Sequence, residues 1–410
     1  MAAETAVKYR SYRLASPRSL GWRARRRWSR YRSSSESSNW ARNSGWADGF
    51  RVTISSMVSR LVMAHILGQI VSRRRFTQRH SRYRRAGREN FSALFRPGGG
   101  VACRAGDAYT AGRERQLPRS QRMESWVEDI PFERVGPVAR AIKAAVTNPL
   151  ANYLPAGFIR ALLRFGKSEL AAANWADPGG WRSMVISYDG RPKQIADKIL
   201  VGSGTMPMAL RNRRRLAGRL LARLIDQSSS NPAHVLCLGA GPGRIIIDAL
   251  HEARRPSRAT LVDISTDAFE YGLKLAAEAG VADRVRYLQG DVRDVQQMLD
   301  TPPDVVKMIG ICEYLDDDHI VDIASAVAAV MPDGAPIVFN SLSNRHGTDR
   351  FFRRVFGLHM IHRSPARLQE LMSRAGFGDF VSIPEPLRVY HVLVGRRMPA
   401  HAKPSSKGLS

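Results

Sequence analysis

The sequence contains few cysteines and no long uncharged apolar run. Its three cysteines, Cys103, Cys237 and Cys312, lie far apart and show no C-x-x-C spacing, so neither a disulfide framework nor a zinc site is predicted. Such cysteine usage is typical of a reducing compartment, and no N-terminal stretch has the apolar core of a secretory signal. We therefore expect a cytoplasmic protein without a transmembrane segment.

Lysine is almost absent from residues 1–122, although this segment is strongly basic. It holds 27 Lys and Arg residues against 6 Asp and Glu, and Lys8 is its single lysine. Charge runs with little patterned apolar sequence cannot bury a core, so we expect residues 1–122 to be a disordered basic extension. The composition becomes ordinary from Met123, and translation from a start codon placed too early is therefore one interpretation of this segment.

Other interpretations of the basic extension stay open. An arginine-rich tail could bind phosphates, with Trp22, Trp28, Tyr31 and Trp40 available for stacking on bases. Import signals are also rich in arginine and serine and poor in acids. The apolar patch Leu61–Val71 is too short to span a bilayer, but it could lie on an anionic membrane surface as a short amphipathic helix. Nucleic acid is thus a conceivable partner of residues 1–122, but it is not the favoured one.

Glycine is concentrated in one short stretch. His234–Leu238 is an apolar run of the kind that forms a buried strand of a parallel sheet. Gly239, Gly241 and Gly243 follow at every second position, and a run with helical spacing comes next. Residues without a Cβ let the chain reverse and let a ligand approach the backbone, where the next helix directs unpaired N–H groups. The dinucleotide fingerprint G-x-G-x-x-G would place its third glycine at Arg244, so the spacing favours another cofactor class.

Further strands and helices are predicted after the glycine stretch. Asp263 ends the second strand, 24 positions after Gly239, where a carboxylate can accept both ribose hydroxyls of a nucleoside. A helix over Ser265–Ala279 would begin at Ser265 or Thr266 as its N-cap. The other expected strands are Ala259–Asp263, Arg284–Leu288, Asp304–Ile309 and Ala335–Ser341, with an antiparallel pair at Phe377–Ile383 and Val389–Val394 and helices at Ile320–Met331 and Arg367–Ala375.

This succession resembles class I S-adenosylmethionine-dependent methyltransferases, above all bacterial members of unassigned substrate. The resemblance is carried by Ala240-Gly-Pro-Gly-Arg244, by Asp263-Ile-Ser265 and by Arg211-Asn-Arg213. It implies an α/β fold over residues 207–397: a Rossmann-like, seven-stranded, mostly parallel sheet with helices on both faces. It also implies S-adenosyl-L-methionine as cofactor and methyl transfer from its sulfonium to a small-molecule or lipid-like acceptor. The alternative is an RNA methyltransferase or a non-catalytic binding protein that uses the basic extension.

The resemblance also assigns the cofactor-binding positions. In the family, the acid after the third strand contacts the adenine amino group and the next residue offers its backbone N–H to the ring; Asp291 and Val292 match these positions. An acid usually stands two residues before the first glycine, near the methionine part of the cofactor, where this chain has Cys237. Asp248, Glu313 or a cap residue could compensate for it. The implied cofactor-binding set is Gly239, Ala240, Gly241, Gly243, Asp263, Ile264, Asp291, Val292 and Gly310.

Catalytic candidates follow the fourth and fifth strands. Methyl transfer is driven mainly by alignment, and a base is needed only when the acceptor must lose a proton. Residues Glu313 and Tyr314, with His319 one turn further on, would face the methyl group, and Glu313 is the best candidate for an acceptor-side carboxylate. In the family the acceptor pocket often follows strand five, where this chain has His346, His359 and His362. Asp318, the last acid of Asp316-Asp-Asp318, is expected to cap the next helix, so no metal is predicted.

A helical cap is predicted over residues 123–206 and a flexible tail over 398–410. Helices are expected at Val138–Thr147 and Phe158–Asn174, with Pro149 and Pro155 breaking the chain between them. Trp175, Trp181 and Tyr188 fall in a predicted connection rich in Gly, Pro and Asp. A longer helix follows, with leucines from Leu210 to Leu224 on its apolar stripe. Its arginines would form either a solvated face or a basic cluster that meets an anionic substrate; they are Arg211, Arg213, Arg214, Arg215 and Arg219.

Overall fold

The structure is a computed structural model and describes residues 118–399. The predictions for residues 1–117 and for the tail after residue 399 therefore lie outside the described residues. The expected disorder of the extension up to residue 122 is wrong at its end, because Arg119 to Arg122 belong to the helix α3 (Arg119–Ser125). Within residues 118–399, every helix is too short or too polar to cross a bilayer.

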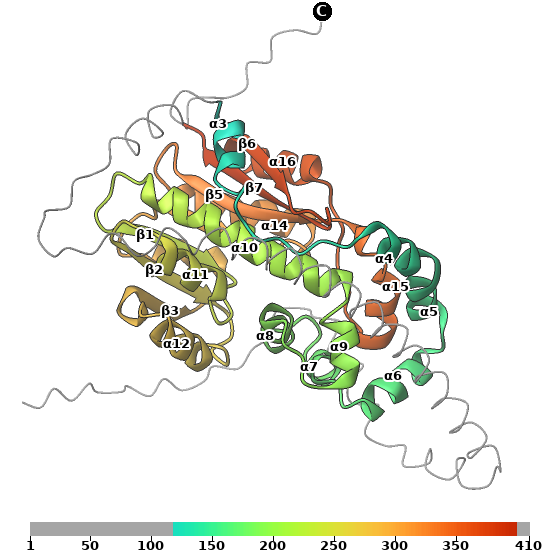
Figure 1. Cartoon of the computed structure of the whole chain (residues 1–410). Helices are drawn as coiled ribbons and strands as arrows, with labels where there is room; N and C mark the ends of the chain where they lie inside the picture. Colours follow the sequence, from blue (N-terminus) through green and yellow to red (C-terminus); the bar gives the residue numbers. More distant parts are fainter. Residues whose placement is uncertain (1–117, 400–410) are drawn as a thin grey trace, which may run out of the picture. The chain divides into compact units, whose positions relative to one another are not determined.

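One seven-stranded sheet forms the centre of the described chain (Figure 1). Its strand order is β3-β2-β1-β4-β5-β7-β6, and only β7 runs antiparallel to its two neighbours. The predicted Rossmann-like, mostly parallel sheet is thereby confirmed, including the final antiparallel pair. The strands are β1 (Ala233–Leu238), β2 (Ser257–Asp263), β3 (Val285–Gln289), β4 (Val305–Met308), β5 (Pro336–Leu342), β6 (Phe377–Pro384) and β7 (Tyr390–Arg397).

The strand order reverses between β1 and β4. From β1 the chain builds outward to β2 and β3, and it then returns to lay β4 against the other edge of β1, with Cys237 opposite Lys307. In open α/β sheets, ligands bind beyond the carboxyl ends of the strands at such a reversal. The place where the glycine stretch follows β1 is therefore the expected ligand position.

Helices cover both faces of the sheet. All six residues of β1 are buried, as expected for a strand with helices on each side. Val235 and Cys237 pack with α10 and α11, whereas Leu236 and Leu238 pack with α14 and α16. The covering helices are α10 (Thr205–Asp226), α11 (Arg244–Glu252), α12 (Phe269–Glu278), α13 (Val295–Met298), α14 (Asp317–Val330) and α16 (Pro365–Arg374).

The segment before α10 is helical, as predicted, and Figure 1 shows α7, α8 and α9 gathered at the beginning of α10. Its apolar residues share a core with the segment that follows β5, including Phe351 and Tyr390. The helices are α3 (Arg119–Ser125), α4 (Pro137–Ile142), α5 (Asn148–Tyr153), α6 (Ala156–Phe165), α7 (Glu169–Ala176), α8 (Trp181–Asp189) and α9 (Ile195–Leu200), with a π-helical segment at Lys143–Thr147 between α4 and α5 and the short α15 (Asp349–Phe351) after β5.

Several details of the predicted helical cap are wrong. The single helix expected over Phe158–Asn174 is two helices, because α6 ends at Gly166 and Ser168 caps α7 with its side chain. Pro149 does not break the chain, since it occupies the first turn of α5, where its missing N–H costs nothing. The predicted connection is largely helical: Trp175 belongs to α7, while Trp181 and Tyr188 belong to α8.

Two predicted helix starts are also wrong. Helix α12 begins at Phe269 with Ala268 at its N-cap, and the Ser265 hydroxyl bonds to Asp267 instead of capping the helix. Helix α14 is capped by Asp316, whose side chain accepts a hydrogen bond from the backbone N–H of His319. The true cap of α14 thus lies two residues before Asp318, which is itself in the first turn.

Candidate active site

The glycine turn after β1 requires glycine for two reasons. The φ angles of Gly239, Gly241 and Gly243 are +53°, +50° and +73°, a region that residues with a Cβ avoid. At Gly239 a Cβ would lie 2.3 Å from Cγ2 of Ile311, so the turn packs directly against the chain after β4. At Gly241 the nearest atom would be Cβ of Trp181, at 3.6 Å. Packing thus excludes side chains at the start of the turn, while at Gly241 the backbone stays approachable.

Asp263 points at this turn. Its Oδ2 accepts a hydrogen bond from the backbone N–H of Gly241 at 2.7 Å, and its Oδ1 accepts one from Ser265 at 3.0 Å. Each carboxylate oxygen keeps a second lone pair for a ligand. The neighbouring Ile264 is 73% exposed, which leaves an uncovered apolar side chain beside the carboxylate. The pair offers hydrogen-bond acceptors for a sugar and an apolar surface for a base.

Asp291 follows β3 and is engaged by its own neighbour. The carboxylate accepts hydrogen bonds from the backbone N–H and the guanidinium of Arg293, at 2.9 Å and 3.0 Å for Oδ1. The bond from the Arg293 side chain is the main reason why the pKa of Asp291 is lowered. Val292 is half-buried against the core beneath. A ligand that used Asp291 would therefore share this carboxylate with Arg293.

Gly310 and Glu313 lie beside a buried arginine of α10. The Gly310 N–H donates to Oδ1 of Asn340 at 2.8 Å, and a Cβ at Gly310 would lie 3.6 Å from Nη2 of Arg213. Arg213 donates to Oε1 of Glu313 at 3.0 Å and to the Tyr188 hydroxyl at 3.0 Å. Arg213 and Glu313 are 1% and 4% exposed in their side chains. The predicted acceptor-side carboxylate is thus locked in a buried ion pair.

Sequence reasoning missed Asn340, Tyr188 and the inward direction of Arg213. The Asn340 amide also donates to Glu313, at 3.5 Å. An asparagine at the end of an apolar strand is the one signal that could have singled it out, because buried polar groups are hydrogen-bonded.

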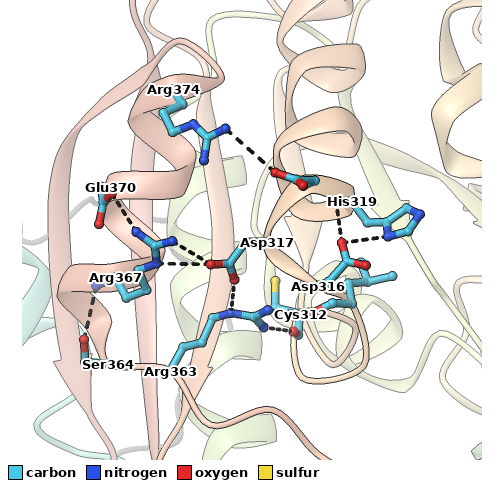
Figure 2. Close-up of polar contacts among 11 residues, drawn as sticks. Cys312, Asp316, Asp317, His319, Arg363, Ser364, Arg367, Glu370 and Arg374 are labelled. Atoms are coloured by element: carbon cyan, nitrogen blue, oxygen red, sulfur yellow. Dashed lines mark hydrogen bonds and ion pairs between the residues drawn. The ribbon is translucent and has the colours of Figure 1, made fainter.

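The other two catalytic candidates occupy different surroundings. Tyr314 is 43% exposed, and a Cβ at Gly179 would lie 2.9 Å from its hydroxyl, so the ring reaches the turn between α7 and α8. His319 lies in the exposed first turn of α14, with Nδ1 at 2.7 Å from Oδ1 of Asp316 (Figure 2). Across residues 118–399, no hydrogen bond or ion pair joins His319 to Glu313. The structure thus separates these two candidates.

Each acid of the Asp316-Asp-Asp318 run has a partner of its own. Asp317 is held by Arg363 at 2.7 Å and by Arg367 at 2.6 Å, as Figure 2 shows. Hydrogen bonds from these arginines, first that of Arg367, lower the pKa of Asp317. In the part of the chain that the structure describes, no three His, Cys, Asp or Glu side chains are grouped so that they could hold a metal ion. The absence of a metal site stays a prediction.

The histidines after β5 do not form one cluster. Nε2 of His346 lies 3.2 Å from Nε2 of His362, and Nδ1 of His346 lies 3.0 Å from the Thr348 hydroxyl. Burial lowers the pKa of His346 to about 4, so its ring is neutral at neutral pH. His359 is exposed. A buried neutral imidazole whose two nitrogens both have partners serves the local structure.

Helix α8 lies over the glycine turn. Nε1 of Trp181 donates to Oδ2 of Asp267 at 3.0 Å, shortly after Asp263 in the chain. At the other end of α8, Asp189 accepts a hydrogen bond from Arg244, the first residue of α11, at 3.1 Å. The helical segment before α10 thus touches both sides of the turn, which the prediction of a connection at this place could not reveal.

The arginines of α10 contradict both interpretations of the sequence. Arg211 makes a bidentate contact to Glu133 with two distances of 2.7 Å, and Arg214 makes one to Asp248 at 2.6 and 2.9 Å. Arg215 and Arg219 also pair with acids of the chain. These side chains are therefore neither an unpaired solvated face nor a free basic cluster. Because Asp248 and Glu313 are occupied by arginines, neither is free to compensate for Cys237.

Comparisons with known proteins give a family match for part of the chain. A family described as "Putative methyltransferase" matches residues 196–396. No curated protein matches the chain.

Among solved structures, similar chains include a possible exported protein from Bordetella parapertussis, with 16% identity over 72% of this chain and 98% of that one and a TM-score of 0.46. Magnesium protoporphyrin IX methyltransferase from Synechocystis PCC 6803 with bound S-adenosylhomocysteine has 12% identity over 58% and 99% of the chains and a TM-score of 0.41. An O-methyltransferase family 2 protein from Planctomyces limnophilus in complex with apigenin has 15% identity over 50% and 70% and a TM-score of 0.35.

The strand order and the glycine turn define an α/β protein of the doubly wound type. The family match over residues 196–396 supports the methyltransferase domain predicted from the sequence. S-adenosyl-L-methionine as the cofactor stays a prediction.

Proposed function

We propose that the protein moves a methyl group from S-adenosyl-L-methionine to a small-molecule or lipid-like acceptor, and that the helical segment over residues 123–206 covers the acceptor site. The observation that carries this proposal is the position of α8 over the glycine turn, held on both sides by Trp181–Asp267 and Arg244–Asp189. A turn covered in this way admits a small acceptor more readily than a nucleic-acid duplex. The pairing of the α10 arginines with acids of the chain also favours an acceptor that needs no basic surface there.

The residues of the turn fit the nucleoside part of the cofactor. Asp263 is fixed by Gly241 and keeps acceptor capacity for ribose hydroxyls, and the exposed Ile264 offers an apolar contact to the adenine ring. Asp291 and Val292 would contact the far side of the ring, with Arg293 ordering the Asp291 carboxylate. Gly239, Ala240 and Gly243 shape the turn, and Gly310 keeps the backbone after β4 close to Arg213.

Bound S-adenosylmethionine supplies an electrophilic methyl group on a positively charged sulfur. The chain's part in the reaction is then to align the acceptor with this methyl group and to exclude water. Tyr314 suits the first task, because the residue is partly exposed and its hydroxyl reaches the turn before α8.

Glu313 is better suited to positioning than to proton transfer. Its carboxylate is buried and shared between Arg213 and Asn340, which also binds the N–H of Gly310. We propose that Glu313 holds the backbone after β4 in place next to the methyl group of the cofactor. His319 remains the candidate base for an acceptor that must lose a proton, since its ring is exposed beside Asp316.

Calorimetric titration with S-adenosylhomocysteine tests the cofactor site. We expect micromolar binding by the full chain and a loss of at least about tenfold in Asp263→Ala, because two charge-assisted hydrogen bonds to the sugar are removed. Asp300→Ala is the matched control, since this exposed acid pairs with Arg286 on the surface. Equal binding by both variants, or no heat from folded wild-type protein, would overturn the proposal.

Tyr314→Phe and Tyr314→Ala separate alignment from proton transfer. If Tyr314 aligns the acceptor by ring contact, the phenylalanine variant should keep most of the methyl transfer and the alanine variant should lose it. Transfer of radiolabelled methyl groups to the small molecules and RNA of a whole-cell extract measures this. Labelled acceptors that are exclusively RNA would contradict a small-molecule role.

A further inference from the structure

Lys307 is a buried cation without an acidic partner. It stands in β4, it is 4% exposed, and its nearest oxygen partner is the backbone carbonyl of Leu238 at 3.5 Å. The thiol of Cys237 belongs to its register partner on the neighbouring strand β1. Within residues 118–399, no carboxylate lies at ion-pair distance from the Lys307 ammonium group. All of its partners are therefore neutral.

A buried ammonium group such as that of Lys307 is stabilised by a nearby negative charge. Taking an ammonium group out of water is unfavourable by several kcal/mol unless an opposite charge is close. Cys237 does not provide this charge, because burial raises the pKa of its thiol and keeps it protonated at neutral pH. Within the described residues, the positive charge of Lys307 is therefore not balanced by a negative charge at ion-pair distance.

The ammonium group lies where the cofactor is expected. Lys307 is the register partner of Cys237, and its Nζ reaches one residue further along β1 to the carbonyl of Leu238, immediately before Gly239. This is the carboxyl end of β1 and β4, between which the strand order reverses. The side chain thus extends towards the underside of the glycine turn.

We infer that Lys307 binds the carboxylate of the cofactor's methionine part, with Cys237 keeping the space beside it free of acid. This inference rests on the proposed cofactor site. It also accounts for the cysteine two residues before the first glycine. An aspartate at position 237 would lie beside Lys307, neutralise it, and compete with the ligand carboxylate.

The test compares two ligands that differ only in this carboxylate, S-adenosylmethionine and its decarboxylated form. Removing one partner of a buried charge pair weakens binding by about 30-fold or more, so the wild-type chain should prefer the carboxylated ligand by this factor. In Lys307→Met this preference should fall to about threefold or less, while affinity for the decarboxylated ligand is kept. A preference that stays intact in a folded Lys307→Met chain overturns the inference.

Cys237→Asp provides an independent variant. We expect it to lose the same preference, because the new carboxylate takes up Lys307, and it decides the question if Lys307→Met does not fold. An intact preference in Cys237→Asp again overturns the inference. Asp263→Ala is the control, since it should weaken both ligands equally. Failure of wild-type protein to bind either ligand would instead contradict the proposed cofactor site itself.

Discussion

Replacement of Glu313 by glutamine should strongly destabilise the protein. The change keeps the shape of the side chain but removes its charge, and it leaves the Arg213 guanidinium buried beside a neutral amide. The two groups are 3.0 Å apart, and their side chains are 1% and 4% exposed. Arg213 cannot lose its proton at any ordinary pH, so it stays an uncompensated charge in the folded state.

The burial of the pair sets the size of the effect. Breaking a buried ion pair by removing one partner costs about 3–5 kcal/mol, whereas an exposed pair contributes about 0–1 kcal/mol. Arg286 and Asp300 form such an exposed pair, with side chains 57% and 78% accessible. We therefore expect Glu313→Gln to lower the free energy of unfolding by at least about 3 kcal/mol and Asp300→Asn to change it by less than about 1 kcal/mol.

Urea unfolding followed by circular dichroism measures both values. The double variant Arg213→Met with Glu313→Met should recover most of the loss, because a buried ion pair can often be replaced by apolar side chains without net destabilisation. A Glu313→Gln chain as stable as Asp300→Asn would refute the reasoning. So would a double variant that is no more stable than the single one.

Three further changes have defined outcomes. Gly239→Ala should abolish binding of S-adenosylhomocysteine in calorimetry, since its Cβ would lie 2.3 Å from Ile311 at a positive φ; unchanged affinity would show that the turn can shift. The free energy of unfolding should fall as the pH drops from about 6.5 to about 4, because His346 stays neutral in the folded protein whereas it takes up a proton in the unfolded chain. The loss should reach about 3 kcal/mol and be smaller in His346→Gln, and identical pH profiles of the two chains would contradict it. Asp316→Ala should cost about 1 kcal/mol in urea unfolding by removing the cap on the N–H of His319, whereas Asp316→Asn, which can still cap, should cost less.

The strands of the sheet were predictable because each is a short apolar run between turn residues. The strand ending at Leu238, the carboxylate at Asp263 and the final antiparallel pair are all local patterns, and the structure places them as expected. The direction of Asp263 towards Gly241 follows from the same logic, since the carboxyl ends of parallel strands meet at one edge of the sheet.

The environment of charged side chains was not predictable from local patterns. A helical wheel does not separate the arginines of α10 into solvated and buried side chains. The environment of each arginine is decided by the position of acids that are distant in the sequence. Arg211 finds Glu133, 78 residues earlier, and Arg213 finds Glu313, 100 residues later. The interpretation of a basic surface was wrong for this reason.

The sequence was sufficient to predict that the cap is helical, but not to predict where its helices end. Gly166 ends α6 inside a segment whose apolar spacing is nearly continuous, and Trp181 begins a helix directly after two glycines. Helix existence follows from periodicity, whereas helix ends depend on single residues and on tertiary contacts such as that of Trp181 with Asp267. The contact of α8 with the glycine turn could therefore not be foreseen.

The most direct test of the cofactor site is a crystal structure of the full chain grown with S-adenosylhomocysteine. The account predicts that both ribose hydroxyls lie within hydrogen-bond distance of the Asp263 carboxylate, with the nucleoside over the backbone of Gly241. A nucleoside bound elsewhere, or an Asp263 side chain turned away from a ligand in the turn, would contradict it.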